Sequence, residues 1–371
     1  MNSFGRIFRI SIFGESHGES VGIVIDGCPA GLPLVLEDFL PDLERRKGGT
    51  QKGTTPRQED DLPIFKSGIF NNLTTGAPIT ILFENKNTRS TDYEKQRAIP
   101  RPGHADFVAR AKFGGFEDYR GSGHFSGRLT VALVAAGVIA KKLLTTLSQA
   151  ALRGKAAYDP DTIGNTTAAH GADSPSPTDN LDNDGIKVTS EIVEIGGEKD
   201  LDKGLQKAIA NKDSIGGIIE CRVNGLPVGL GEPFFDSAES LLGHIVFAIP
   251  AVRGIEFGTG FAAARMFGSQ HNDSIENMAG QTRTNHAGGI VGGLTNGNEL
   301  VFRIAIKPTS STPKEQTTLN WETEKIETVS VKGRHDLCIA LRVPVILEAV
   351  TAVVVADLLL LEQRIKRILP S

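Results

Sequence analysis

Two histidines stand in glycine-containing turns, where their side chains would be free to take part in chemistry. His17 lies in the sequence FGESHG and His104 lies in RPGHAD. Glycine permits tight turns and lets backbone N–H groups approach a ligand closely, and histidine changes charge near neutral pH. Because Arg101 precedes His104 by three residues, this pattern predicts acid–base chemistry on an anion. Each histidine taken alone is equally consistent with a turn residue bonded to nearby backbone.

Basic residues cluster close to these motifs. A run follows the first histidine motif and consists of Arg45, Arg46, Lys47, Lys52 and Arg57. The planar guanidinium of arginine suits carboxylates and phosphates and stays charged. The run alone fits a solvated surface equally well. Arg101 and Arg334, which lie near His104 and Asp336 in glycine-containing turns, favour a binding function.

Two further segments could bind a phosphate. The sequence GSGHFSGR at 121–128 precedes a predicted helix, and helix N-termini bind anions. The sequence KPTSS at 307–311 offers hydroxyl groups and backbone donors, although it could be a plain polar turn. Neither the dinucleotide-binding pattern GxGxxG after a strand nor the P-loop pattern GxxxxGK[ST] is present. The metal-binding pattern HExxH is absent from the sequence as well.

Composition excludes several classes of protein. The net charge of −4 over 371 residues disfavours a general nucleic-acid binder. The three cysteines lie far apart, which disfavours a disulfide framework or structural zinc and fits a reducing cytoplasm. No signal peptide is read at the start of the chain. The longest apolar segment, 343–361, contains Pro344, Glu348 and Asp357, so it predicts a buried helix and no membrane span.

The elements that must position these residues alternate between strands and helices. Alternating or continuous apolar runs predict strands at 6–13, 21–26, 78–84, 216–224 and 300–306, and helices at 37–47, 128–147, 201–211 and 345–366. The second and last of these helices are apolar nearly all round, which is typical of a helix covered on several sides. The pattern predicts a layered α+β architecture with helices inside and sheets outside. Residues 158–185, rich in Pro, Asn, Asp and Ser, predict a long surface loop.

Six motifs occur together in one order along nearly the whole chain. They are FGESHG at 13–18, RPGHAD at 101–106, GLGEP at 229–233, NHAGGIVGG at 285–293, KPTSS at 307–311 and GRHD at 333–336. In this combination the chain resembles the chorismate synthase family. The resemblance implies one domain over 1–371, an α+β sandwich of antiparallel sheets around central helices, and a homotetramer in the cytoplasm.

The resemblance also implies an activity. Members of the family are lyases that remove phosphate and a ring proton from 5-enolpyruvylshikimate 3-phosphate in a 1,4-elimination, giving chorismate in the last step of the shikimate pathway to aromatic amino acids. Reduced FMN is required without net redox change. Because no additional flavin reductase domain is recognised, we expect the monofunctional bacterial type, which needs an external flavin reductant and turns over little with NADPH and oxidised FMN alone. No nucleic-acid or membrane partner is implied.

Residue roles follow from the same resemblance. His17 resembles the histidine that protonates the departing phosphate, His104 the one that supports anionic reduced flavin, and Asp336 the aspartate that assists proton removal through flavin N5. Substrate contacts are expected from Arg46, Lys52 and Arg101. Flavin contacts are expected from His124, Phe125, Ser126, Pro250, Ala251, Gly292, Lys307, Pro308, Thr309, Ser310, Ser311 and Arg334.

Two positions depart from the family pattern. His124, Phe125 and Ser126 stand where many members have Arg-Ser-Ser, so either backbone groups contact the flavin there or His124 replaces the arginine. Lys52 stands where an arginine is common, which would turn a bidentate contact into a single point charge. Two other functions stay open on the residues alone: a flavin-dependent oxidoreductase with net electron transfer, and a non-catalytic anion-binding protein.

Overall fold

The computed structural model describes residues 1–48, 53–54, 60–86, 97–146, 185–331 and 336–362. Lys52, Arg334 and almost all of the loop expected at 158–185 lie outside the described residues. One antiparallel sheet is built from the first part of the chain, in the order β1-β2-β3-β7-β4. Its strands are β1 (Ser3–Phe4), β2 (Arg9–Gly14), β3 (Ser20–Asp26), β7 (Ile79–Glu84) and β4 (Ile64–Ser67).

A second antiparallel sheet comes from the later part of the chain, in the order β10-β13-β9-β8. Its strands are β10 (Val252–Phe257), β13 (Leu300–Ile306), β9 (Gly217–Asn224) and β8 (Lys187–Ile195). The centre of this sheet is wholly apolar on its inner face, where Phe302 pairs with Cys221 and both side chains are fully buried. These two sheets confirm the predicted α+β sandwich of antiparallel sheets.

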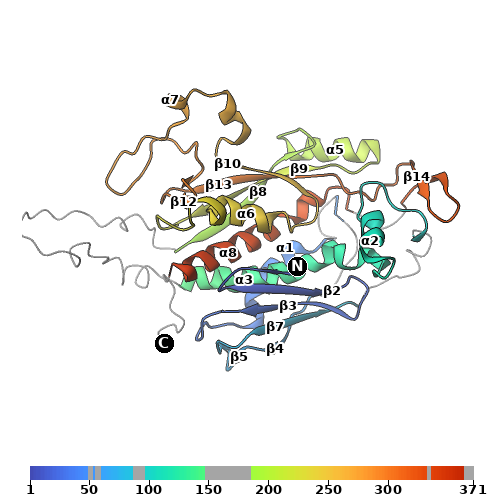
Figure 1. Ribbon diagram of the computed structural model, residues 1–371, viewed down its shortest axis with the longest axis horizontal. Coiled ribbons are helices and arrows are strands. Elements are labelled where there is room, and N and C mark those ends of the chain that lie inside the picture. Colours follow the sequence, from blue (N-terminus) through green and yellow to red (C-terminus); the bar gives the residue numbers. More distant parts are fainter. Residues whose placement is uncertain (49–52, 55–59, 87–96, 147–184, 332–335, 363–371) are drawn as a thin grey trace, which may run out of the picture.

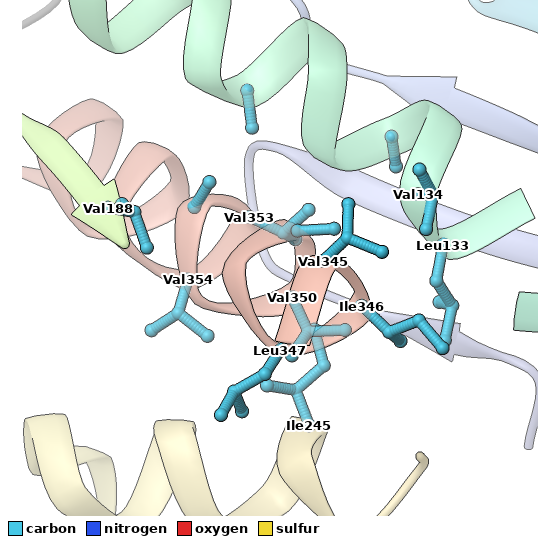
Figure 2. Packing of buried hydrophobic residues seen from close by; sticks show 14 of the residues in the cluster. Leu133, Val134, Val188, Ile245, Val345, Ile346, Leu347, Val350, Val353 and Val354 are labelled. Carbon is cyan, nitrogen blue, oxygen red and sulfur yellow. The ribbon is translucent and has the colours of Figure 1, made fainter. Parts of the chain in front are cut away.

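Two long helices, α3 (Thr130–Thr146) and α8 (Pro344–Leu361), run between the sheets (Figure 1). They pack closely because α3 carries Gly137, where an added Cβ would lie 2.2 Å from the Cβ of Ala349 in α8. Figure 2 shows the apolar side chains that fill this layer, with Leu133 of α3 close to Ile346 of α8. By composition α8 is apolar enough to cross a membrane, but 89% of it is buried inside the protein. The prediction of a buried helix is confirmed.

Shorter elements surround these layers. The helices are α1 (Leu40–Arg46), α2 (Asp106–Phe113), α5 (Leu201–Asn211), α6 (Ala238–Val246) and α7 (Gly268–His271); the remaining strands are β5 (Ile69–Phe70), β6 (Leu73–Thr74), β11 (Ile290–Val291), β12 (Leu294–Thr295), β14 (Gln316–Asn320) and β15 (Lys325–Val329). The helix expected over 37–47 begins later, at Leu40, with Pro41 in its first turn. A proline is tolerated there because the first N–H groups of a helix have no partner within it. A separate 3₁₀ turn occupies Leu36–Asp38.

Candidate active site

A cleft of about 540 Å³ is lined by segments that lie far apart in the sequence. Its lining residues fall within 46–48, 101–105, 121–130, 249–251, 307–311 and 336–346, together with Ser16 and Asp61. The cleft therefore gathers residues from the end of α1, the start of α3, the start of α8 and the loops after β7 and β13. Several of the sequence motifs thus meet at one place.

Most of the predicted site residues border this cleft. They are His104, Asp336, Arg46, Arg101, Phe125, Ser126, Pro250, Ala251, Lys307, Pro308, Thr309, Ser310 and Ser311. His17, His124 and Gly292 are not among the lining residues. Arg334 and Lys52 cannot be located, because they lie outside the described residues.

His17 lies directly behind the wall of the cleft. Its side chain is buried, with 8% of the residue exposed, and its neighbour Ser16 lines the cleft. A Cβ added to Gly121 would lie 2.5 Å from Nε2 of His17. Gly121, with a φ of +56°, therefore allows the imidazole to pack against the backbone of the cleft wall. A side chain at residue 121 would displace His17.

His104 belongs to a compact ionic cluster. Its Nδ1 lies 2.6 Å from Oδ1 of Asp106, and its Nε2 lies 3.2 Å from Oγ of Ser122. Arg101 donates to both carboxylate oxygens of Asp106, each at 2.8 Å, and to Ser122 at 3.0 Å. Burial tends to raise the pKa of Asp106, but the hydrogen bonds from Arg101 and His104 hold that pKa well below its usual range. Asp106 therefore stays ionised and fixes both partners.

A second cluster joins Arg46 to two residues that the sequence did not single out, Asp61 and Arg128. Arg46 donates to Oδ2 of Asp61 at 2.8 Å, and Arg128 pairs with Oδ1 of the same carboxylate. Burial lowers the pKa of the Arg46 guanidinium, against the opposing effect of Asp61. Arg128 stands in the quoted segment 121–128, whereas no sequence signal marks Asp61.

Asp336 is held by Arg342, another residue that sequence reasoning missed. Nη1 of Arg342 donates to Oδ2 of Asp336 at 3.0 Å, and its Nε donates to the carbonyl oxygen of Arg46 at 2.9 Å. The Asp336 side chain is only 11% exposed. This contact ties the carboxylate of one motif to the cation cluster of another.

Three buried polar atoms on the cleft wall have no hydrogen-bond partner among the described residues: Oγ of Ser16, Nε of Arg46 and Oγ1 of Thr309. In the same segment as Thr309, Lys307 donates to Oγ of Ser310 at 3.0 Å. Burial, and secondarily Arg253, lowers the pKa of Lys307. Because unpaired buried polar groups are costly, these atoms fit a cleft that takes a ligand rich in acceptor oxygens.

His124 and Gly292 have different surroundings. Nδ1 of His124 lies 2.9 Å from the carbonyl oxygen of Gly14, and Nε2 lies 3.0 Å from Oδ1 of Asn2. Both ring nitrogens are thus used within the chain, and a flavin contact by this ring stays a prediction. Gly292 occupies the turn between β11 and β12, where it has a φ of +65°. Within the described residues no group of three potential metal ligands occurs.

An α+β sandwich that brings histidine, carboxylates and at least four arginines to one cleft defines an enzyme site for an anionic substrate. The family model described as "Chorismate synthase" matches residues 8–360, so the chain belongs to the chorismate synthase family.

Similar proteins support this membership over the full length. The chain is 63% identical to a chorismate synthase of Chitinophaga pinensis, with 99% of both chains covered. It is 40% identical to one of Methanocaldococcus jannaschii, covering 97% of this chain and 96% of that one. A solved structure titled "Crystal Structure of Chorismate Synthase" shares the fold, with a TM-score of 0.65 at 24% identity and 96% and 93% of the two chains covered. The predicted family, lyase activity and place in aromatic amino acid synthesis are confirmed.

Proposed function

We propose that this cleft is the active site in which the chain removes phosphate and a ring proton from 5-enolpyruvylshikimate 3-phosphate to form chorismate. The observation that carries the proposal is the convergence of Arg46, Arg128, Arg101 and Lys307 on one cleft that also holds His104 and Asp336. The substrate bears a phosphate and two carboxylates. Fixed cations of this kind neutralise the charge of the leaving phosphate without having to reorganise during the reaction.

His17 is the proposed acid for the departing phosphate. It lies behind Gly121 next to Ser16, whose unpaired hydroxyl borders the cleft. A phosphate is a better leaving group when a proton reaches it as the C–O bond breaks. Burial at 8% exposure keeps the imidazole in one place for that transfer. The assignment itself is carried over from the family resemblance.

Reduced FMN is the proposed cofactor, and Thr309 with Lys307, Ser310 and the 250–251 backbone would hold it. The unpaired hydroxyl of Thr309 and the ammonium of Lys307, both bordering the cleft, fit its phosphate and polar ring edge. Bound there, the cofactor would supply an electron transiently and take it back. His104, held by Asp106 and Ser122, would present a fixed ring to an anionic partner. Asp336, oriented by Arg342, would assist removal of the ring proton.

The same proposal includes the assembly and surroundings of the enzyme. We expect a cytoplasmic homotetramer that receives reduced flavin from an external reductant. Exposed apolar side chains in the later part of the chain support self-association, among them Phe234, Phe235, Phe261, Phe267 and Met278, which are 77–92% exposed. Light scattering should give four times the mass of the chain. A monomer at micromolar concentration would contradict this part.

Anaerobic mixing of the protein, reduced FMN and 5-enolpyruvylshikimate 3-phosphate tests the function. We expect equal amounts of chorismate and phosphate with no net loss of reduced FMN.

His17→Ala and His104→Ala should each lower kcat by about 100-fold or more, since general acid–base groups contribute about that much. His271→Ala, outside the cleft, should keep wild-type kcat. One reductant consumed per product would instead indicate the oxidoreductase, and wild-type turnover of both variants would refute the two assignments.

A further inference from the structure

Asp61 is a buried carboxylate that bridges two arginines of the cleft. Its side chain is 0% exposed, and those of Arg46 and Arg128 are each 4% exposed. One carboxylate oxygen accepts from Nη2 of Arg46 at 2.8 Å, and the other pairs with Nη1 of Arg128. All three residues border the cleft. Each arginine therefore has its own oxygen on a single shared anion.

Further hydrogen bonds fix the orientation of both guanidinium groups. Arg46 donates from Nη1 to Oγ1 of Thr130 at 3.1 Å. Arg128 donates from Nε to Oδ1 of Asn85 at 2.9 Å and from Nη2 to the carbonyl oxygen of Glu84 at 3.2 Å. Side chains fixed in this way lose little conformational freedom when a ligand binds. The Nε of Arg46 has no partner among the described residues, so one of its donors is left for a ligand.

The cluster sets two guanidinium groups against one shared carboxylate. Burial tends to raise the pKa of Asp61, but Arg46 and Arg128 lower it below its usual value, so the carboxylate is ionised at neutral pH. Removing one member of such a buried ionic group leaves its partners without their counter-charge, so Asp61 and the two arginines depend on one another.

The backbone of Asp61 is also unusual. Its φ is +51°, in the left-handed region that residues other than glycine seldom adopt. Such a conformation persists where the surroundings impose it. Asp61 adopts this conformation shortly before β4 (Ile64–Ser67), where its carboxylate contacts both arginines. Both the position and the charge of Asp61 are therefore tightly specified.

We propose that Asp61 is a positioning residue, which holds Arg46 and Arg128 as a rigid pair so that together they bind one anionic group of the substrate. The proposal deepens the proposed function and rests on the substrate being anionic. A positioning role and a role that only neutralises positive charge predict opposite changes in anion binding when Asp61 is removed. If Asp61 only reduced positive charge, its removal would strengthen anion binding; if it aligns the guanidinium groups, its removal weakens anion binding although the cleft becomes more positive.

Two variants separate these roles, with inorganic phosphate as the probe and the substrate in parallel. Asp61→Asn removes the charge at constant shape, and Asp61→Glu keeps the charge but displaces the carboxylate by one methylene group. We expect both to weaken phosphate binding by calorimetry, and to raise the KM for substrate, by about tenfold or more, because small misplacements of binding groups have effects of that order. Asp60→Asn, at the exposed neighbouring position, should leave both constants unchanged.

Each outcome is informative. Tighter phosphate binding in Asp61→Asn, or wild-type binding in Asp61→Glu, would overturn the positioning role, as would a wild-type protein that binds no phosphate. If Asp61→Asn does not fold by circular dichroism, Asp61→Glu alone decides. Absence of chorismate formation by the wild type would refute the proposed function, yet the phosphate measurement would still test Asp61. The two failures are therefore distinguishable.

Discussion

Arg45 and Arg46 are adjacent in α1, yet their guanidinium groups bind two different buried carboxylates. Arg45 reaches Glu348 of α8, whereas Arg46 reaches Asp61 at the edge of the cleft. Consecutive residues of a helix point in directions about 100° apart. One short helix thus serves two sites, and the two carboxylates show how a similar chemical arrangement can support either stability or binding.

Glu348 is fully used by the protein itself. Its Oε1 accepts from Arg45 at 2.7 Å and from the backbone N–H and hydroxyl of Ser190 in β8, while Oε2 accepts from Arg45 and from Lys141 of α3, each at 2.7 Å. The carboxylate therefore joins α1, α3, α8 and β8. The Asp61 cluster differs in that it borders the cleft and leaves Nε of Arg46 without a described partner. Saturated polar contacts indicate a structural role, and unsatisfied ones indicate a ligand site.

Removal of Glu348 should have the largest effect on stability. In Glu348→Ala the side chains of Lys141 and Arg45 lose their shared anion, and deleting one partner of a buried ion pair costs about 3–5 kcal/mol. We expect about 3 kcal/mol, since the Arg45 side chain is 46% exposed and can turn to water. Urea unfolding gives the free energy of unfolding, and kcat of the folded protein should be preserved.

A matched control is Glu362→Ala, at the exposed end of the same helix. It should change the free energy of unfolding by no more than about 0.5 kcal/mol, as exposed surface substitutions generally do. Equal losses in the two variants, or a loss of kcat in folded Glu348→Ala, would contradict the assignment of Glu348 to stability.

The adjacent arginines give a sharper test of the comparison. Arg46→Lys should lower kcat/KM about 30-fold, equivalent to about 2 kcal/mol, because lysine cannot hold Asp61, Thr130 and a ligand with one planar group. Arg45→Lys should keep kcat/KM and reduce stability by about 1 kcal/mol through the lost bidentate contact. Steady-state kinetics and urea unfolding of both variants check this. The reverse pattern would show that the roles of the two carboxylates are exchanged.

Much of the architecture could be predicted because it depends on local apolar patterns. The central helices have no polar face over most of their length, and this alone indicated that they are covered on both sides. Yet Glu348 and Asp357 were interpreted only as interruptions of an apolar segment. In the structure Asp357 accepts hydrogen bonds from the backbone N–H groups of residues 6, 7 and 8 at 2.7–2.9 Å. Such partners lie about 350 residues away, and no local pattern identifies them.

The same limit applies to the site. Sequence motifs marked His104, Arg101 and the 307–311 segment, and all of these border the cleft. Asp61 follows a run of acidic residues and resembles a solvated charge in the sequence. Its burial is a consequence of where the end of α1 and the turn before α3 bring Arg46 and Arg128 together. A contact set by tertiary packing cannot be derived from residue spacing alone.

Lowering the pH should have the smallest effect on stability of the changes considered. It tests whether Glu348 and Asp61 both stabilise the fold through their ion pairs. Burial tends to raise the pKa of Glu348, but Arg45 and Lys141 lower it below its ordinary value of 4.5. A carboxyl group whose pKa is lower in the folded state stabilises the fold above its unfolded pKa and loses that contribution as pH falls through the folded pKa. The free energy of unfolding should therefore decrease below about pH 4.5.

In Glu348→Gln this decrease should be smaller, as measured by urea unfolding between pH 6 and about pH 3. Asp61→Asn should behave likewise, since the pKa of Asp61 is lowered by its arginines against the effect of burial. Wild-type pH dependence in both variants would mean that neither ion pair contributes to stability in acid. The two carboxylates would then have no such contribution in common.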